Sequence, residues 1–167
     1  MAQYSPDAFS LPQRLLHWLM FLLIGFNLIF SDGMEHWNRL VRRGGPVAPE
    51  DVSAANIHAY VGIAILCLAG LRLLLRLTQG APAAPPQEPA LLRLAAKLAH
   101  GAFYLLFFAM PLSGIAAYYF GVSQAGFLHG GPLKALFWAL IAAHVAAVAV
   151  HQFYWKTAVL SRMTKGG

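Results

Sequence analysis

The sequence predicts an all-α protein, a four-helix transmembrane bundle that forms one integral-membrane domain over residues 1–167. The chain is 59% hydrophobic and only 11% charged, whereas a water-soluble domain carries about 25% charged residues. Four long apolar stretches each approach or exceed the roughly 20 residues needed to cross a bilayer. None of the four alternates with a period of two, so the pattern disfavours a membrane β-barrel.

The first predicted helix covers about residues 13–31 and contains the run LLHWLMFLLIGFNLIF. It could begin one turn earlier, at Pro12, because proline suits the first turn of a helix. Asp7 and a single basic residue, Arg14, precede the run, and IFSDG follows it where a secretory signal would have a small-residue cleavage site. We therefore expect a retained helix. Charged residues then populate the connection at 31–55.

The other three helices are predicted at about 56–77, 94–120 and 133–155. Residues 78–93 separate the second from the third, and their APAAPPQEP run predicts a linker because proline interrupts a helix interior. Residues 121–132, GVSQAGFLHGGP, predict a short Gly-rich turn before the last helix.

The net charge of +6 indicates membrane topology rather than nucleic-acid binding, because the basic residues bracket apolar segments instead of covering a polar domain. The positive-inside rule places both termini and the Pro-rich linker in the cytoplasm. The basic residues that support this orientation are Arg14, Arg72, Arg76, Arg93, Lys97, Lys156, Arg162 and Lys165. Arg39, Arg42 and Arg43 are a counterweight on the opposite side.

Histidines are the candidate functional residues, and the chain has seven of them. His36 and His129 fall in predicted connections, where a solvated loop residue is the expected role. The other five fall within predicted membrane helices, where ionisable residues are rare and usually functional. These five are His17, His58, His100, His144 and His151.

The predicted helix directions place these five histidines at two depths in the membrane. His17, His100 and His151 fall toward the cytoplasmic side, and His58 and His144 fall higher. His144 and His151 are seven residues apart, so they share one helix face about 10.5 Å apart. Two histidines from different helices at one depth are what a haem with two imidazole ligands requires.

Histidines in membrane helices also have roles that involve no haem. One histidine hydrogen-bonded to a neighbouring helix needs no cofactor, but five at two depths favour haem. Zinc is a second alternative, although zinc sites usually include Cys, Asp or Glu and the predicted helices contain no acidic residue. Arg14 lies one turn from His17, where its guanidinium could bind a haem propionate.

Four motifs occur in order along the chain. The first helix opens with R-x-x-H-W, and the second carries N-x-H, a glycine four residues after that histidine, and R-L-L-L-R-L. The third carries H-x-x-x-Y-L-L-F and P-L-S-G, and the fourth H-x6-H-x3-W-K. Their residues are Arg14, His17, Trp18, Asn56, His58, Gly62, Arg72–Leu77, His100, Tyr104–Phe107, Pro111–Gly114, His144, His151, Trp155 and Lys156. Over essentially its whole length the chain resembles the bacterial cytochrome b561 family.

This resemblance implies a four-helix protein of the bacterial inner membrane with two b-type haems. By motif position, His17 and His151 would bind the iron of the cytoplasmic-side haem, and His58 and His144 that of the periplasmic-side haem. His100 would lie beside the haem or at a quinone site, although its depth also allows it to replace one ligand. Family members exchange electrons with ubiquinone, and some oxidise superoxide.

Three functions follow as hypotheses. The first is a superoxide:ubiquinone oxidoreductase, an enzyme in which the basic residues Arg39, Arg42 and Arg43 would attract superoxide to the periplasmic side. The alternative is a cytochrome b carrier subunit that relays electrons between quinol and a partner redox protein. A third is a non-redox membrane protein whose histidines bind metal or carry protons. Membrane lipid is an expected partner in each case, and nucleic acid is not.

Overall fold

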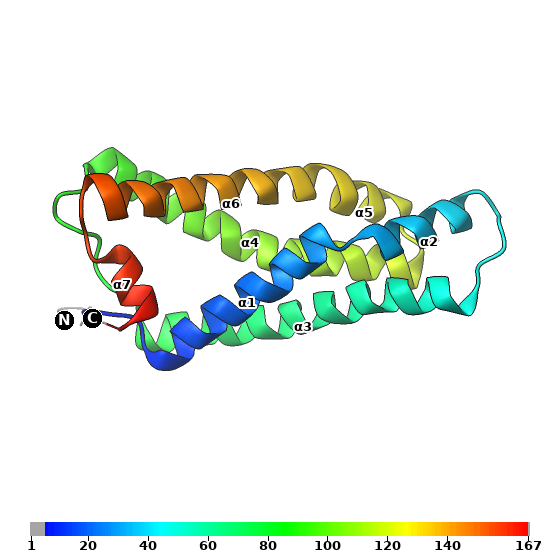
Figure 1. The fold of residues 1–167 in the computed structure, drawn as a ribbon, viewed down its shortest axis with the longest axis horizontal. Coiled ribbons are helices and arrows are strands. Elements are labelled where there is room, and N and C mark those ends of the chain that lie inside the picture. Colours follow the sequence, from blue (N-terminus) through cyan, green and yellow to red (C-terminus); the bar gives the residue numbers. More distant parts are fainter. Residues whose placement is uncertain (1–5, 167) are drawn as a thin grey trace.

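The computed structural model describes residues 6–166, and within that range the only regular elements are helices. Four spans are long and apolar enough to cross a membrane: α1 (Leu11–Ile29), α3 (Pro49–Gln79), α4 (Ala90–Phe120) and a composite fourth span, Ser123–Tyr154. They lie side by side in an elongated bundle (Figure 1). The predicted all-α bundle of four membrane helices is confirmed.

The start of α1 is fixed by a capping box. Ser10 Oγ accepts from the backbone N–H of Gln13 at 3.4 Å, and the Gln13 side chain accepts from the Ser10 N–H at 3.1 Å. Pro12 lies in the first turn, as expected for a helix start. Gln13 also donates to the backbone oxygen of Gly80 at 3.0 Å. The beginning of α1 is therefore held against the end of α3.

The segment predicted as a connection at 31–55 contains a further helix, α2 (Asp32–Arg42), and the first turns of α3. Helix α2 is polar on one side and lies at the end of the bundle away from α7 (Val159–Thr164) (Figure 1). A Cβ atom at Gly33 would lie 2.8 Å from the Cβ of Ala54. Only glycine at this position lets α2 approach α3 so closely.

The fourth span begins at Ser123, ten residues before the predicted start at 133. It comprises α5 (Ser123–Leu128), the π-helical turn η1 (His129–Leu133), α6 (Lys134–Ala149) and a second π-helical turn, η2 (Val150–Tyr154). The predicted turn at 121–132 is therefore wrong. Gly and Pro in this segment do not break the helix, because membrane helices absorb them by local π-helical adjustments.

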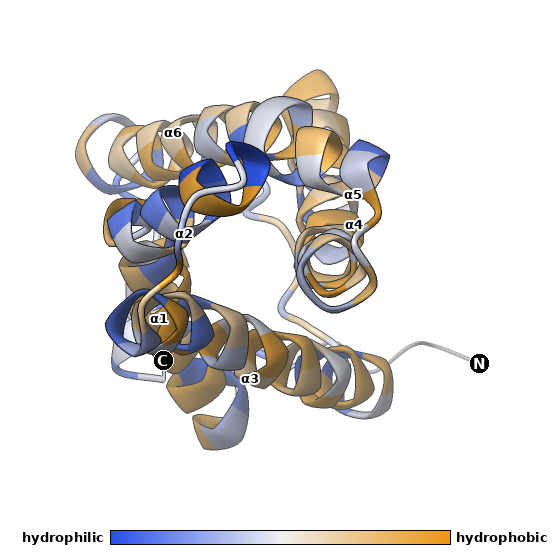
Figure 2. Ribbon diagram, turned by 90° about the vertical axis from the view of Figure 1, so that its right-hand side faces the viewer, coloured by the Kyte–Doolittle hydropathy of each residue, from blue (hydrophilic) through white to orange (hydrophobic). Residues whose placement is uncertain are grey.

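The interior of the bundle is apolar at mid-height. Viewed end-on, the four spans surround a common interior (Figure 2), and α3 packs closely on α1 and α4, while α4 also packs on α6. The buried apolar core consists of Leu16, Met20, Ile24, Ile65, Ala69, Leu106, Met110 and Phe137.

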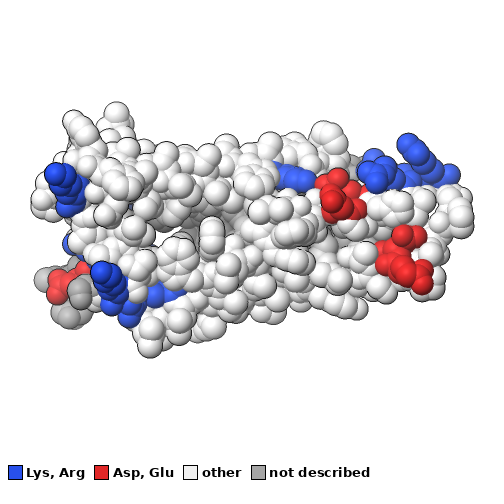
Figure 3. All heavy atoms as spheres, viewed as in Figure 1, with Lys and Arg blue, Asp and Glu red and all other residues white. Residues whose placement is uncertain are grey.

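The outer surface of the spans is also apolar. Leu22 is 64% exposed, and only 6–22% of each span's most apolar segment is buried inside the bundle. On the face shown in Figure 3, the charged side chains lie mainly near the two ends. An apolar band between charged ends is what a lipid bilayer accommodates, so the chain is a multi-pass membrane protein.

A short C-terminal helix, α7, closes the end of the bundle where α1 begins (Figure 1). Its backbone oxygens accept hydrogen bonds from α1: Arg14 Nη1 donates to Thr164 O at 2.9 Å, and Trp18 Nε1 donates to Met163 O at 3.2 Å. Arg162 of α7 donates to the backbone oxygen of Ala83 in the Pro-rich linker at 2.9 Å. Three separate segments thus meet at this end.

Candidate functional site

Three histidines gather toward the α7 end of the bundle, and we call them the inner cluster: His17 of α1, His100 of α4 and His144 of α6. The ring centroids of His17 and His144 are 6.3 Å apart, and those of His100 and His144 are 6.0 Å apart. His17 and His144 are half-buried, whereas His100 is exposed.

Hydrogen bonds at the inner cluster distinguish the ring nitrogens. His100 Nδ1 lies 2.7 Å from the backbone oxygen of Ala96, and because a carbonyl only accepts, this nitrogen carries the proton. Its Nε2 is then free to bind a metal in the neutral ring. Arg72 Nη2 donates to His17 Nδ1 at 3.2 Å, so the proton of the neutral His17 ring is on Nε2. Binding of a metal through Nε2 would move this proton to Nδ1 and release Arg72 from the ring. The sequence analysis used Arg72 as an orientation signal and as part of the second-helix motif, although a cation inside an apolar helix is itself a functional signal.

Two histidines lie close together near α2, and we call them the outer pair: His58 of α3 and His129 of η1, with ring centroids 6.0 Å apart and ring planes at 80°. His129 Nδ1 donates to the backbone oxygen of Met110 at 2.9 Å, which leaves Nε2 as the unprotonated nitrogen. His58 Nδ1 is buried and has no hydrogen-bond partner within residues 6–166. A buried, unpartnered ring nitrogen costs free energy unless a bound group satisfies it.

A cavity of about 500 Å³ adjoins the outer pair, a size typical of sites that bind small molecules and cofactors. Apolar residues dominate its wall, among them Ile24, Leu106 and Phe107. Helix α2 contributes Trp37 and Arg42 to the same wall. The cavity therefore joins the outer pair to the basic residues at this end of the molecule.

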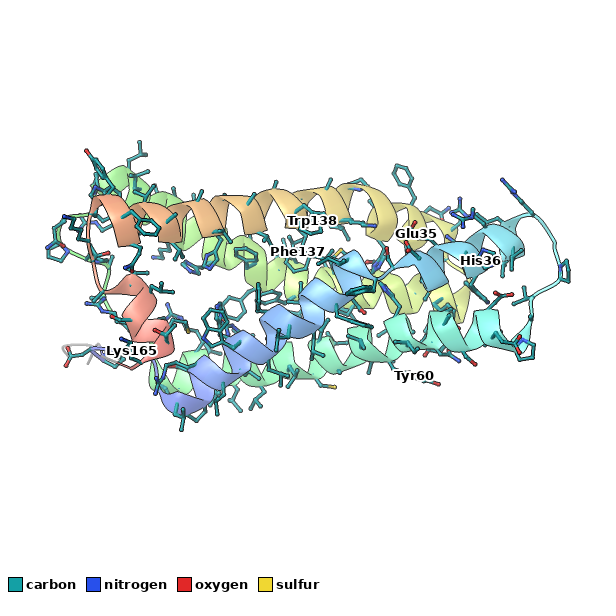
Figure 4. The ribbon with its side chains drawn as sticks, viewed as in Figure 1. Glu35, His36, Tyr60, Phe137, Trp138 and Lys165 are labelled. Carbon is teal, nitrogen blue, oxygen red and sulfur yellow. The ribbon has the colours of Figure 1, made fainter. Side chains whose placement is uncertain are left out.

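An aromatic layer separates the two groups of histidines. Phe137 of α6 lies 6.1 Å from Phe103 and 6.0 Å from Phe107 of α4, measured between ring centroids. The Phe103 ring lies 5.6 Å from that of His144. Phe137 is only 4% exposed, and Figure 4 marks its place on α6. The outer pair and the inner cluster thus occupy different levels of one continuous interior.

The predicted histidine pairs are not the ones that the structure brings together. The sequence pairs His17 with His151 and His58 with His144, whereas His144 lies beside His17 and His129 lies beside His58. The reason is the early start of the fourth span, which puts its midpoint nearer its N-terminus and lowers His144 to the level of His17.

His129 is the candidate site residue that the sequence pattern did not reveal. The sequence predicts a solvated loop residue there, but His129 is half-buried and lies within the fourth span. The signal that could have identified it is the absence of charge between Gly121 and Leu133, which allows the apolar helix to extend through the glycines.

His151 occupies a separate polar cluster near the end of the fourth span. Its Nδ1 lies 2.9 Å from Thr157 Oγ1, and its Nε2 lies 3.8 Å from the carboxylate of Glu88 in the Pro-rich linker. Both His151 and Glu88 are buried. These contacts account for the polar atoms of His151 without any cofactor.

Arg14, the predicted propionate partner, lies beside the inner cluster on α1. One of its terminal nitrogens binds the backbone of Thr164, while its Nε is buried without a hydrogen-bond partner in the described part of the chain. Arg14 therefore has donor capacity left for an acidic group.

The residues present fit haem better than a bare metal ion. In residues 6–166 no group of three or more His, Cys, Asp or Glu side chains could hold a metal ion. Two imidazole nitrogens each about 2 Å from one metal ion would have ring centroids roughly 6 Å apart, which is the separation found at both levels. Haem needs only two protein ligands, because its macrocycle supplies the other four.

Paired imidazoles at two levels of a four-span helical bundle define a membrane cytochrome of the b type. The chain belongs to the prokaryotic cytochrome b561 family, whose sequence model matches residues 8–166. It is thus a membrane electron carrier, and its family implies b-type haem binding and a place in the inner membrane.

Three curated relatives align over most of the chain. A probable superoxide oxidase CybB from Yersinia pestis is 29% identical and covers 89% of this chain and 90% of its own length. Cytochrome b562 from Cereibacter sphaeroides is 32% identical, with 92% of each chain covered. Cytochrome b561 homolog 1 from Escherichia coli K12 is 28% identical and covers 94% of this chain and 97% of its own length.

Proposed function

We propose that this protein is a di-haem cytochrome that takes electrons from superoxide at its outer face and delivers them to the ubiquinone pool. The observation that carries the proposal is the occurrence of facing imidazoles at two levels of one apolar interior, at ring separations of 6.3 Å and 6.0 Å. Both termini and the Pro-rich linker lie in the cytoplasm in this proposal, which follows from the distribution of basic residues.

The ligand set that we propose is His17 with His144 at the inner level and His58 with His129 at the outer level. Neither pair comes from two helices that pack closely on each other in the described residues, so the helix backbones would not exclude a macrocycle between the rings. His100 and His144, by contrast, come from the closely packed helices α4 and α6. His100 is therefore assigned a place beside the inner haem.

When bound, each haem supplies a centre that accepts and releases one electron. The chain supplies the ligands, their orientation and the apolar surroundings. Met110 O holds the His129 ring with its Nε2 free. Arg14 and Arg72 are the cations of the inner level that could hold the propionates.

The proposed substrate step is balanced as follows. Two superoxide anions each lose one electron and leave as O₂, and the two electrons together with two protons convert ubiquinone to ubiquinol. Arg42 and Lys134 both line the cavity beside the outer pair, so an anion drawn to this end of the molecule meets cations along its path. The relative named as a probable superoxide oxidase supports the same substrate.

Rapid mixing of the oxidised, haem-loaded protein with superoxide tests the proposal. We expect haem reduction well above the background rate, with a rate constant that falls as salt concentration rises. Arg42→Gln should slow the reaction, whereas Arg43→Gln is the matched control, since Arg43 does not line the cavity.

Two results would count against the proposal. Reduction no faster than background would exclude superoxide as the electron donor. If a stable redox partner also co-purifies and exchanges electrons with the haems, the protein is a carrier that relays electrons between quinol and that partner.

A further inference from the structure

The spacing of the inward-facing residues on the fourth span is irregular by one residue. Phe137 and His144 are seven residues apart, which in a regular α-helix at about 100° per residue leaves them within roughly 20° of each other. His129 and Phe137 are eight residues apart, and eight regular residues would turn His129 about 80° away from Phe137. Because Phe137 is 4% exposed and marks the interior, a regular helix would aim His129 away from the interior.

The π-helical turn η1, His129–Leu133, lies between these two residues. A π-helical turn holds one more residue than an α-helical turn, so eight residues cover the angle that seven would cover. The backbone is ordinary α-helix on either side, with φ and ψ of −62° and −45° at Leu128 and −60° and −45° at Lys134. The extra residue is therefore confined to η1, and His129 returns to the side of Phe137 and His144.

The local sequence explains why the extra residue is held at this place. Pro132 has no N–H to donate to the carbonyl four residues earlier, and its ring clashes with that carbonyl in a regular α-helix. A wider turn relieves this clash, and Gly130 and Gly131 lower the cost of the wider turn because they have no side chain to crowd the backbone.

The facing helix, α4, has a matching space for the His129 ring. A Cβ atom at Gly114 would lie 3.0 Å from His129 Cε1 and 3.3 Å from His129 Nδ1. Ser113 Oγ lies 3.2 Å from the same Nδ1. The ring is thus held between a hydrogen-bonding backbone and a glycine that leaves room for it.

We propose that η1 is a one-residue insertion in the fourth membrane helix that turns His129 into the bundle, and that Gly114 is the space made for its ring. His129 would bind iron only because η1 corrects its direction. This inference rests on the proposed role of His129 as an outer haem ligand, and it adds that the ligand is positioned by an irregular turn rather than by the helix itself.

Changing the length of the turn tests the proposal. Deletion of Gly131 combined with Pro132→Ala removes the extra residue and the proline that holds it, so we expect a regular α-helix with His129 still inward. Haem content should stay at about two per chain, with an unchanged spectrum. Insertion of one alanine between Pro132 and Leu133 should turn His129 by roughly a further 100° and reduce haem content to about one. The same insertion between Gly121 and Val122, upstream of His129, is the matched control and should retain both haems.

The outcomes separate this inference from the assignment of the ligand. If His129→Ala retains both haems, the ligand assignment fails, and the inference fails with it. If His129→Ala loses the outer haem but the deletion variant also loses it, or binds no haem at all, only the role of η1 is overturned. An insertion variant that keeps both haems with a wild-type spectrum would overturn that role as well.

Discussion

The inner cluster and the outer pair both bring imidazole rings to about 6 Å from each other, but their surroundings differ. The pairs proposed as ligands, His17 with His144 and His58 with His129, each come from helices that do not pack closely on each other in the described residues. The inner cluster adds a half-buried cation, Arg72, in contact with His17. The outer pair instead opens on a cavity of about 500 Å³ that α2 helps to line. The inner level is thus equipped to hold negative charge, and the outer level to admit a small molecule.

Helix α2, which helps to line the cavity of the outer level, is held in place by polar contacts. Ser31 Oγ donates to Glu35 Oε1 at 2.8 Å, and Lys134 Nζ donates to the same oxygen at 3.2 Å. His36 Nε2 lies 3.4 Å from Asp51 Oδ1. Figure 4 shows Glu35 and His36 on α2, with Glu35 toward the fourth span. Polar contacts to α3 and to the fourth span therefore hold α2 over the outer cavity. A membrane-spanning helix would instead be held by apolar packing.

The largest expected effect is loss of one haem when a ligand is removed. His144→Ala should lower haem content from about two per chain to about one, by loss of the inner haem, and His129→Ala should do the same at the outer level. His151→Ala is the control and should keep both haems, because its contacts are with Thr157 and Glu88. Haem per chain and the reduced-minus-oxidised spectrum measure this. Loss of a haem in the His151 variant would restore the pairing predicted from the sequence.

Glycine substitution should distinguish the two levels more finely. In Gly114→Ala the new methyl group would lie 3.0 Å from the His129 ring, and because overpacking costs about 1–3 kcal/mol the outer haem should be retained roughly tenfold less well. Gly101→Ala, next to His100 at the inner level, meets no atom within 4 Å and should have no such effect. Titration of the haem-free proteins with haem compares them. Equal affinities would mean that the space at Gly114 is not needed.

Removal of the half-buried Arg72 side chain should change the inner level alone. Arg72→Gln should lower the reduction potential of the inner haem by tens of millivolts, since a unit positive charge within about 8 Å favours the reduced form by roughly 2 kcal/mol at an effective dielectric constant of 20. Arg72→Lys should restore most of the potential, and Arg76→Gln, one turn further along α3 and exposed, serves as the control. A spectroelectrochemical titration resolves the two haems, and a shift confined to the outer haem would contradict the assignment.

The smallest expected effect is a pH dependence of α2. Hydrogen bonds from Ser31 and then Lys134 hold the pKa of Glu35 below its ordinary value. The folded-state pKa is thus lower than the unfolded one, so this stabilisation is present above the unfolded pKa of about 4.3 and is lost as pH falls through the folded value. Because the pair is exposed, it contributes at most about 1 kcal/mol.

Hydrogen exchange in α2, compared at pH 6 and below pH 4, measures this contribution. Because intrinsic amide exchange is itself slower at the lower pH, the protection factors are compared. Protection of α2 is expected to be smaller at the lower pH, and Glu35→Gln should abolish most of the difference. Glu50→Gln, at the start of α3, is the control. An unchanged difference in the Glu35 variant would show that the contact does not hold α2.

The four-helix bundle could be predicted from the sequence, because the length of each apolar stretch can be read directly from the residues. It also identified His17, His58, His100, His144 and His151 as candidate site residues, since ionisable residues are rare in apolar helices. The order of the histidines in depth required the true ends of the fourth span. The start of this span was predicted too late because Gly130, Gly131 and Pro132 would indicate a turn in a soluble protein. Here they lie within a membrane helix.

Contacts made by polar side chains were the part that could not be predicted. Nothing in the local sequence indicates that Glu88, in a Pro-rich linker, lies buried beside His151. The same is true of Arg72, which could have pointed toward the membrane surface instead of toward His17. Such contacts depend on how distant segments pack, and no local propensity encodes that arrangement.

The attachment of α7 has a consequence for how this protein tolerates change. Its bonds to α1 are accepted by the backbone oxygens of Met163 and Thr164, and every amino acid offers the same oxygen. Substitution of the side chains at these two positions should therefore leave both hydrogen bonds in place, provided that the helix keeps its length and position. A chain shortened before Val159 would lose both acceptors together with Arg162, so the attachment of α7 to α1 should tolerate substitution at Met163 and Thr164 but not truncation.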